Sequence, residues 1–161
     1  MAADGDYHEI AYAVRADGVA TPGLVLMEQL ENKRWPDLDQ TDNHQPSLRR
    51  RLLAMFQYLA DYGELEQRDS YNRLDNGLWE FKVGHVRLTF YDTDGVGGFV
   101  PKYGDPVQEF TGKTKWLLPQ DFDEYLRLGF AFPKVSEKTL EEDKLEANAV
   151  REEDVDHDRD S

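Results

Sequence analysis

Residues 76–92, "NGLWEFKVGHVRLTFYD", constrain the fold more than any other part of the chain. Side chains along a β-strand alternate between two faces, and two alternating runs flank the dipeptide Gly84-His85. A two-residue turn with glycine at its first central position fits a type II′ hairpin. The segment therefore predicts an antiparallel hairpin of fixed register, because a slip of one residue would mix its two faces.

One face of the predicted hairpin is apolar and the other is charged. The cross-strand pairs of the apolar face are Val83–Val86, Phe81–Leu88 and Trp79–Phe90. On the charged face Lys82 lies opposite Arg87, and such a like-charge pair costs up to about 1 kcal/mol. Two interpretations stay open: Glu80 neutralises both cations on a hydrated face, or the cations form a site for an anion such as phosphate.

The rest of the chain predicts further strands and helices around this hairpin. The predicted strands are residues 7–14, 70–74 and 111–119, and the predicted helices are residues 24–31, 47–63 and 119–130. Ser47 is the expected N-cap of the clearest helix, and Gly63 is the glycine expected to end it. This order indicates an α+β fold, with one curved antiparallel sheet packed against two N-terminal helices and a C-terminal helix.

The last part of the chain has a different composition from the rest. Residues 134–161 contain 5 Lys or Arg, 11 Asp or Glu and no aromatic residue. Such a composition predicts a disordered acidic tail beyond a domain of residues 1–133, with transient helix around residues 140–150. The tail is interpreted either as a solubilising end or as a functional segment that covers a basic site or mimics nucleic acid.

Charge and composition exclude several classes of function. The net charge of −14 is opposite to the basic footprint of a protein that binds long nucleic acids non-specifically. Residues 45–133 are nearly neutral, with 11 basic and 13 acidic residues, so a local basic site is still compatible. The absence of cysteine excludes disulfides and thiolate metal sites. We expect no membrane segment, no metal and no cofactor, and we expect a cytoplasmic protein, because no long apolar run, signal peptide or nucleotide-binding motif is present.

Three stretches occur in an order typical of a known protein family. The helix "LRRRLLAMFQYLADYG" precedes "YNRLDNGLWEFKVGHVRLTFYD", and "FTGKTKWLLPQDFDEYLRL" follows. The second stretch resembles the core k-x-L-x-x-G-L-W-E-L-R…Y-R-x-x-Y, and the third resembles F-x-K-K-x-x-x-x-P before a C-terminal helix. Over residues 24–132 the chain resembles the RelE/ParE superfamily of toxins from type II toxin–antitoxin systems, nearest its phage-derived HigB-like branch. A RelE-like fold is what this resemblance implies.

The resemblance also implies a reaction and its residues. Family members are typically ribosome-dependent mRNA endoribonucleases, in which a ribose 2′-OH attacks the adjacent phosphate, and a cognate antitoxin protein neutralises them. Carried over by position, Arg87 would clamp the phosphate, and Lys82 stands where the family usually has arginine. Lys113 and Lys115 correspond to the paired lysines of the pattern. His85 is either an acid–base group or simply a turn residue.

A second function fits the same resemblance. The acidic charge and the absence of a family-type catalytic residue after the last predicted helix favour a non-catalytic RelE-like binding protein. Such a protein, of phage or mobile-element origin, would act on a host protein.

Overall fold

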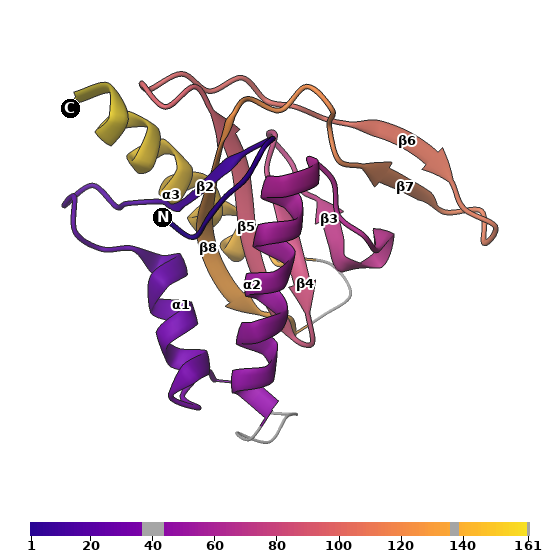
Figure 1. Ribbon diagram of the computed structural model, residues 1–161, viewed down its shortest axis with the longest axis horizontal. Coiled ribbons are helices and arrows are strands. Elements are labelled where there is room, and N and C mark those ends of the chain that lie inside the picture. Colours follow the sequence, from indigo (N-terminus) through magenta and orange to yellow (C-terminus); the bar gives the residue numbers. More distant parts are fainter. Residues whose placement is uncertain (37–43, 136–138, 161) are drawn as a thin grey trace.

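The centre of the molecule is a six-stranded sheet in the order β1-β2-β8-β5-β4-β3 (Figure 1). A computed structural model describes residues 1–36, 44–135 and 139–160. The strands of the sheet are β1 (Ala3–Asp4), β2 (Glu9–Tyr12), β3 (Tyr71–Arg73), β4 (Trp79–Val83), β5 (Val86–Thr93) and β8 (Tyr125–Pro133). Neighbouring strands are antiparallel except β2 and β8, which are parallel. The fold is therefore α+β, but the expectation of a wholly antiparallel sheet is wrong, because β8 inserts between β2 and β5.

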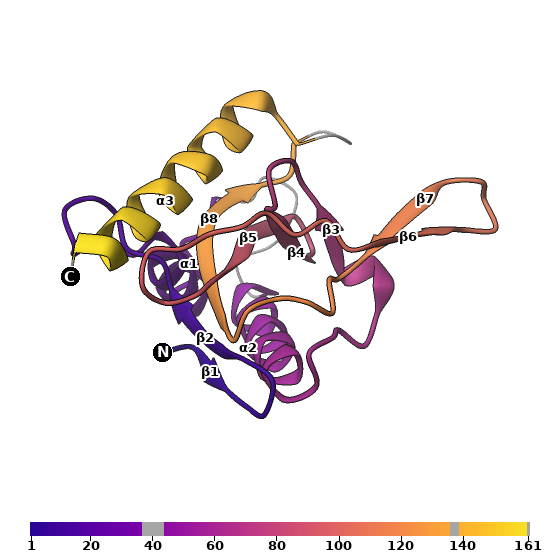
Figure 2. The same cartoon turned by 90° about the horizontal axis from the view of Figure 1, so that it is seen from above.

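Helices cover both faces of this sheet. Figure 2 shows α1 (Pro22–Glu31) and α2 (Gln45–Tyr62) on one side and α3 (Glu141–Asp160) on the other. Leu26 of α1 and Phe56 of α2 share one apolar core with Phe81 and Leu88 of the sheet. Among the described residues, no helix is both long and apolar enough to cross a membrane.

The central hairpin has the predicted register. Its cross-strand pairs are Trp79–Phe90, Glu80–Thr89, Phe81–Leu88, Lys82–Arg87 and Val83–Val86. Gly84 has a φ of 56°, whereas His85 is not among the residues with positive φ, as a type II′ turn requires. The hairpin therefore presents one apolar face to α1 and α2 and its charged face to the opposite side.

The ends of α2 agree with the prediction at one end and differ at the other. Gly63 ends the helix with a φ of 72°, and its N–H donates to the carbonyl of Leu59 at 2.9 Å. The predicted N-cap Ser47 is wrong, because the helix begins at Gln45. Pro46 suits this first turn, where a backbone N–H has no partner within the helix.

A separate two-stranded sheet projects from the body (Figures 1 and 2). It pairs β6 (Asp105–Gln108) with β7 (Thr114–Leu117) in antiparallel fashion, and we call it the β6–β7 arm. The strand predicted at residues 111–119 thus exists, but it pairs within the arm. A short 3₁₀ helix, η2 (Arg68–Ser70), leads into β3 near the arm.

The helix predicted over residues 119–130 is wrong, since this segment leads into the central strand β8. Phe122, Tyr125 and Leu126 have helical spacing, but Leu126 and Leu128 also have the spacing of a strand face, and both are buried in the core. The strand β8 pairs along both edges, with β2 and with β5. Backbone pairing on two sides overrides a short helical pattern.

The prediction of a disordered tail over residues 134–161 is also wrong where the structure describes it. The helix α3 spans Glu141–Asp160, and Ala147, Val150 and Val155 pack against Tyr91 of the sheet. The expected helical tendency around residues 140–150 falls inside α3. Few but well-spaced apolar side chains attach this highly charged helix to the sheet.

A buried carboxylate anchors α3. Asp154 is fully buried and accepts hydrogen bonds from the Tyr91 hydroxyl at 2.6 Å and the Val14 N–H at 2.9 Å. Arg127 of β8 pairs with it at 3.1 Å and with Asp158 at 3.0 Å. A buried charge is tolerated only when it is paired and hydrogen-bonded, so Asp154 joins α3 to β5, to β8 and to the residues after β2.

We expect Asp154→Ala to lower the free energy of unfolding by about 3 kcal/mol, because it leaves buried donors of Tyr91 and Arg127 without their acceptor. Urea unfolding followed by circular dichroism measures this change. Asp156→Ala is the matched control on the same helix, since the side chain of Asp156 is 65% exposed and forms an ion pair with Arg159. The control should change stability by less than about 0.5 kcal/mol. Equal stability of the two variants would contradict the anchoring role.

Candidate functional site

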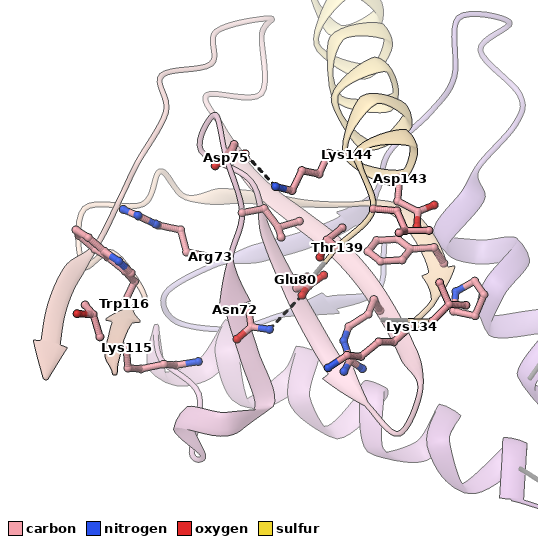
Figure 3. A pocket seen from close by; sticks show the side chains of 17 residues that line it. Asn72, Arg73, Asp75, Glu80, Lys115, Trp116, Lys134, Thr139, Asp143 and Lys144 are labelled. Atoms are coloured by element: carbon pink, nitrogen blue, oxygen red, sulfur yellow. Dashed lines mark hydrogen bonds and ion pairs between the residues drawn. The ribbon is translucent and has the colours of Figure 1, made fainter. Parts of the chain in front are cut away.

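Part of the second face of the sheet is not covered by α3. The helix packs over the end of the hairpin that carries Leu78 and Tyr91. The turn end of the same face carries Glu80 and Arg87, and there a cleft of about 300 Å³ opens between the sheet, the start of α3 and the β6–β7 arm (Figure 3). The site thus follows from the hairpin register, because alternation puts Glu80, Lys82 and Arg87 on this face.

The cleft continues into a wider groove of about 880 Å³ between the sheet and the arm, with Asn72, Thr114 and Lys115 lining both. The basic residues around the two hollows are Arg68, Arg73, Lys82, Arg87, Lys113, Lys115, Lys134 and Lys144. The acidic ones are Asp69, Asp75, Glu80, Glu109 and Asp143. A protein with a net charge of −14 therefore gathers an excess of cations here, as an anion-binding site requires.

Glu80 is the least expected group in the cleft. Glu80 is 2% exposed, and its Oε1 accepts a hydrogen bond from the Asn72 side-chain amide at 3.1 Å (Figure 3). Within the described residues, Oε2 is buried without a hydrogen-bond partner. Burial raises the pKa of Glu80 above its usual value of 4.5, although the Asn72 hydrogen bond and the charges of Arg87 and Lys82 act in the opposite direction. A carboxyl group held in this way is suited to exchanging a proton.

Two lysines that line the hollows come from different elements, Lys115 from the arm and Lys82 from β4. Lys115 of the arm donates a hydrogen bond to the carbonyl of Tyr71, and its Nζ lies 4.2 Å from the centroid of the Tyr71 ring. Burial, followed by the charge of Lys82, lowers the pKa of Lys115 to about 8. The pKa of Lys82 is also lowered, by burial and by the charges of Arg87 and Lys134. Neither ammonium group is neutralised by a carboxylate within 4 Å in the described residues, so an incoming anion would relieve their repulsion.

Arg87 is used by the protein itself. It is 5% exposed, and its Nη1 donates to the carbonyls of Gly84 at 2.8 Å and Val86 at 3.0 Å. The side chain therefore curls back onto the hairpin turn while it lines the cleft. The positive charge of Arg87 favours the ionised form of Glu80.

Four of the five predicted site residues are brought together. Arg87 lines the cleft, Lys82 and Lys113 line the groove, and Lys115 lines both. His85 lies in the turn, where its carbonyl accepts the Lys134 N–H at 2.7 Å, and it lines neither hollow. The sequence pattern predicts Glu80 only as a neutralising charge. Its place on the charged hairpin face was visible, but its burial depends on β3 and on the cleft walls.

The carboxylates of residues 92–98 bind groups of the protein itself. Asp92 pairs with Lys102 at 2.6 Å, and Asp94 accepts the N–H groups of Val96 and Gly98. In the described part of the chain, no three or more His, Cys, Asp or Glu side chains are placed to hold a metal ion.

Comparisons of the chain with protein-family models, with curated proteins and with solved structures found no match.

We expect the stability difference between Glu80→Gln and wild type to depend on pH. A raised pKa means that the folded state holds the Glu80 proton more tightly than the unfolded state, so wild-type stability falls as pH rises from the unfolded pKa through the folded pKa. The glutamine variant cannot ionise, and its relative stability should increase across this window and stay constant above it. Urea unfolding of both proteins at a series of pH values tests this.

The matched control is Glu109→Gln, which removes an exposed carboxylate from the rim of the groove. This change should alter the free energy of unfolding by less than about 0.5 kcal/mol. A Glu80→Gln difference that stays flat or decreases with rising pH would show that Glu80 is not held as a weak acid.

Proposed function

We propose that this chain is an endoribonuclease that cleaves mRNA on the ribosome, the toxin of a type II toxin–antitoxin pair. One observation carries the proposal: Glu80, a buried carboxyl of raised pKa, and Lys115, a lysine of pKa about 8, line one cleft surrounded by cations. An acid and a base whose pKa values have moved toward neutrality are what proton transfer at phosphorus needs. The resemblance to the RelE/ParE superfamily supplies the target, mRNA in the cytoplasm, and the partner, a cognate antitoxin.

The proposed step is an internal transfer within RNA. The Glu80 carboxylate takes the proton of a ribose 2′-OH, and the 2′ oxygen forms a bond to the adjacent phosphorus. The bond from phosphorus to the 5′ oxygen breaks, and Lys115 gives this oxygen a proton. The products are a 2′,3′-cyclic phosphate and a 5′-hydroxyl end. Lys82 and Lys134 stabilise the extra negative charge that develops on the phosphate oxygens.

Arg87 has a positioning role in this proposal. Its guanidinium holds the carbonyls of the turn and places a fixed positive charge near Glu80. That charge increases the fraction of Glu80 that is ionised and able to act as a base. The phosphate clamp is formed by Lys82 and Lys134, which are more exposed.

A second candidate is a non-catalytic binding protein with the same fold, acting on a host protein. The burial of Arg87 against the turn favours it, because the residue in the position of the family's phosphate clamp is occupied by backbone carbonyls. The cleft would then bind an acidic group of a partner without reaction.

We expect wild-type protein to create new 5′ ends in an mRNA that ribosomes are translating, and Glu80→Gln to reduce the cleavage rate by about 100-fold or more, the usual contribution of a general base. Cell-free translation followed by mapping of 5′ ends measures this. Glu31→Gln is the control, because Glu31 lies on α1, across the sheet from the cleft, and is 61% exposed. Intact mRNA with wild type would favour the binding protein, and equal cleavage by Glu80→Gln would exclude Glu80 as the base.

The cleavage rate should fall as pH rises through about 8, because Lys115 then loses the proton that the leaving oxygen needs. Lys115→Arg should move this fall to higher pH, since a guanidinium keeps its proton. Single-turnover rates between about pH 6 and 10 give the profile. An alkaline limb that stays in place in Lys115→Arg would assign the proton to another group.

A further inference from the structure

The β6–β7 arm ends in an aromatic side chain that the protein does not cover. Phe110 has a relative exposure of 107%, the highest among the exposed large apolar residues of the described chain. A two-stranded hairpin is marginally stable by itself, and an uncovered phenylalanine at its tip adds nothing to folding. The conspicuous feature of the arm is therefore what its tip presents to solvent.

The turn fixes the position of Phe110. The Glu109 N–H donates to the Lys113 carbonyl at 2.8 Å, and the Gly112 N–H donates to the Glu109 carbonyl at 2.9 Å. Gly112 has a φ of 86°, the left-handed conformation that a three-residue hairpin loop needs at this place. The backbone of Phe110 is thus held at one end of the groove.

The arm is tied to the edge strand β3 at its other end. The Arg73 guanidinium lies 3.5 Å from the centroid of the Trp116 ring, and Lys115 bonds to the carbonyl of Tyr71. These contacts hold the arm beside the sheet and make it one wall of the groove. Lys113 closes the turn that carries Phe110, and Lys115 lies two residues farther back along the arm, roughly 7 Å along a strand.

The groove between these ends has the charge that a nucleic-acid strand needs. The groove is lined by four basic residues, Arg68, Lys82, Lys113 and Lys115. Only two of its other described lining residues are acidic, Asp69 and Glu109. Phe110 lines the same groove. Backbone-tracking cations combined with an exposed aromatic ring are the arrangement by which proteins bind single strands, because every unpaired base can stack on the ring.

We propose that the groove binds single-stranded RNA, with an unpaired base a few nucleotides from the cleft stacked on Phe110. The proposal rests on the proposed function and specifies its substrate: RNA that is unpaired beside the cleaved bond. Duplex RNA is a poor ligand, since its bases are already paired and stacked.

The test is a binding measurement that does not depend on cleavage. A fluorescently labelled single strand of about ten nucleotides, with 2′-O-methyl groups that block attack, is titrated with the full-length protein and followed by anisotropy. Phe110→Ala should weaken binding by about 5- to 100-fold, and Phe110→Trp should restore it. Val100→Ala is the control, because Val100 is 64% exposed and does not line the groove. A duplex of the same length should bind more weakly and respond little to Phe110→Ala.

The outcomes separate this inference from the proposed reaction. Weaker binding by Phe110→Ala upholds the inference even if wild type leaves mRNA intact, and the reaction alone is then wrong. Equal binding by wild type and Phe110→Ala overturns the inference even if cleavage occurs. Duplex binding as tight as single-strand binding also overturns it. No binding of either oligonucleotide overturns it as well, and would assign Phe110 to a protein contact.

Discussion

The register of the β4–β5 hairpin is the constraint on which the rest of the structure depends. It places Trp79, Phe81 and Val83 on one face with their apolar partners, and α1 and α2 bury that face. The same alternation forces Glu80, Lys82 and Arg87 onto the other face. The apolar core and the charged cleft are therefore two sides of one arrangement, and neither can move along the strands without the other.

The helix α3 covers one part of the second face of the sheet, and the cleft lies on the other part. Asp154 holds the helix over Tyr91 and Arg127, at the apolar end of that face. The helix starts at the rim of the cleft, where Lys144 pairs with Asp75 at 3.2 Å (Figure 3). Most of the acidic residues of α3 therefore lie beyond its first turn, away from the cleft. This distribution explains how a strongly acidic protein keeps an excess of positive charge around one cleft and the adjoining groove.

The sequence predicted the local elements better than their assembly. The hairpin register, the helix over residues 24–31 and the glycine that ends α2 follow from alternation, periodicity and turn chemistry, which act over a few residues. In the segment that contains β8, Phe122, Tyr125 and Leu126 have the spacing of a helix and Leu126 and Leu128 have the spacing of a strand. Only pairing with β2 and β5 decides between the two. The helix α3 was missed because its buried side chains are few and one of them, Asp154, is charged.

The same limit applies to the candidate site. The cations Lys82 and Arg87 were found because they face each other across two neighbouring strands. Burial is the main cause of the raised pKa of Glu80 and of the lowered pKa of Lys115, and it depends on elements that come together only in the folded chain, such as the arm and the sheet. Tertiary burial of this kind leaves no periodic signal in a sequence.

The parallel pairing of β2 with β8 has a consequence for the order in which the molecule is made. Glu9 pairs with Tyr125, and Ile10 pairs with Leu126. The strand β2 can therefore form this pairing only after more than 100 further residues have been made. At roughly 5–20 residues per second, ribosomal synthesis separates the two strands by on the order of ten seconds. Contacts so distant in sequence also make folding slow. The cleft has its walls only when β8 and α3 have emerged, so an unfinished chain has no assembled cleft.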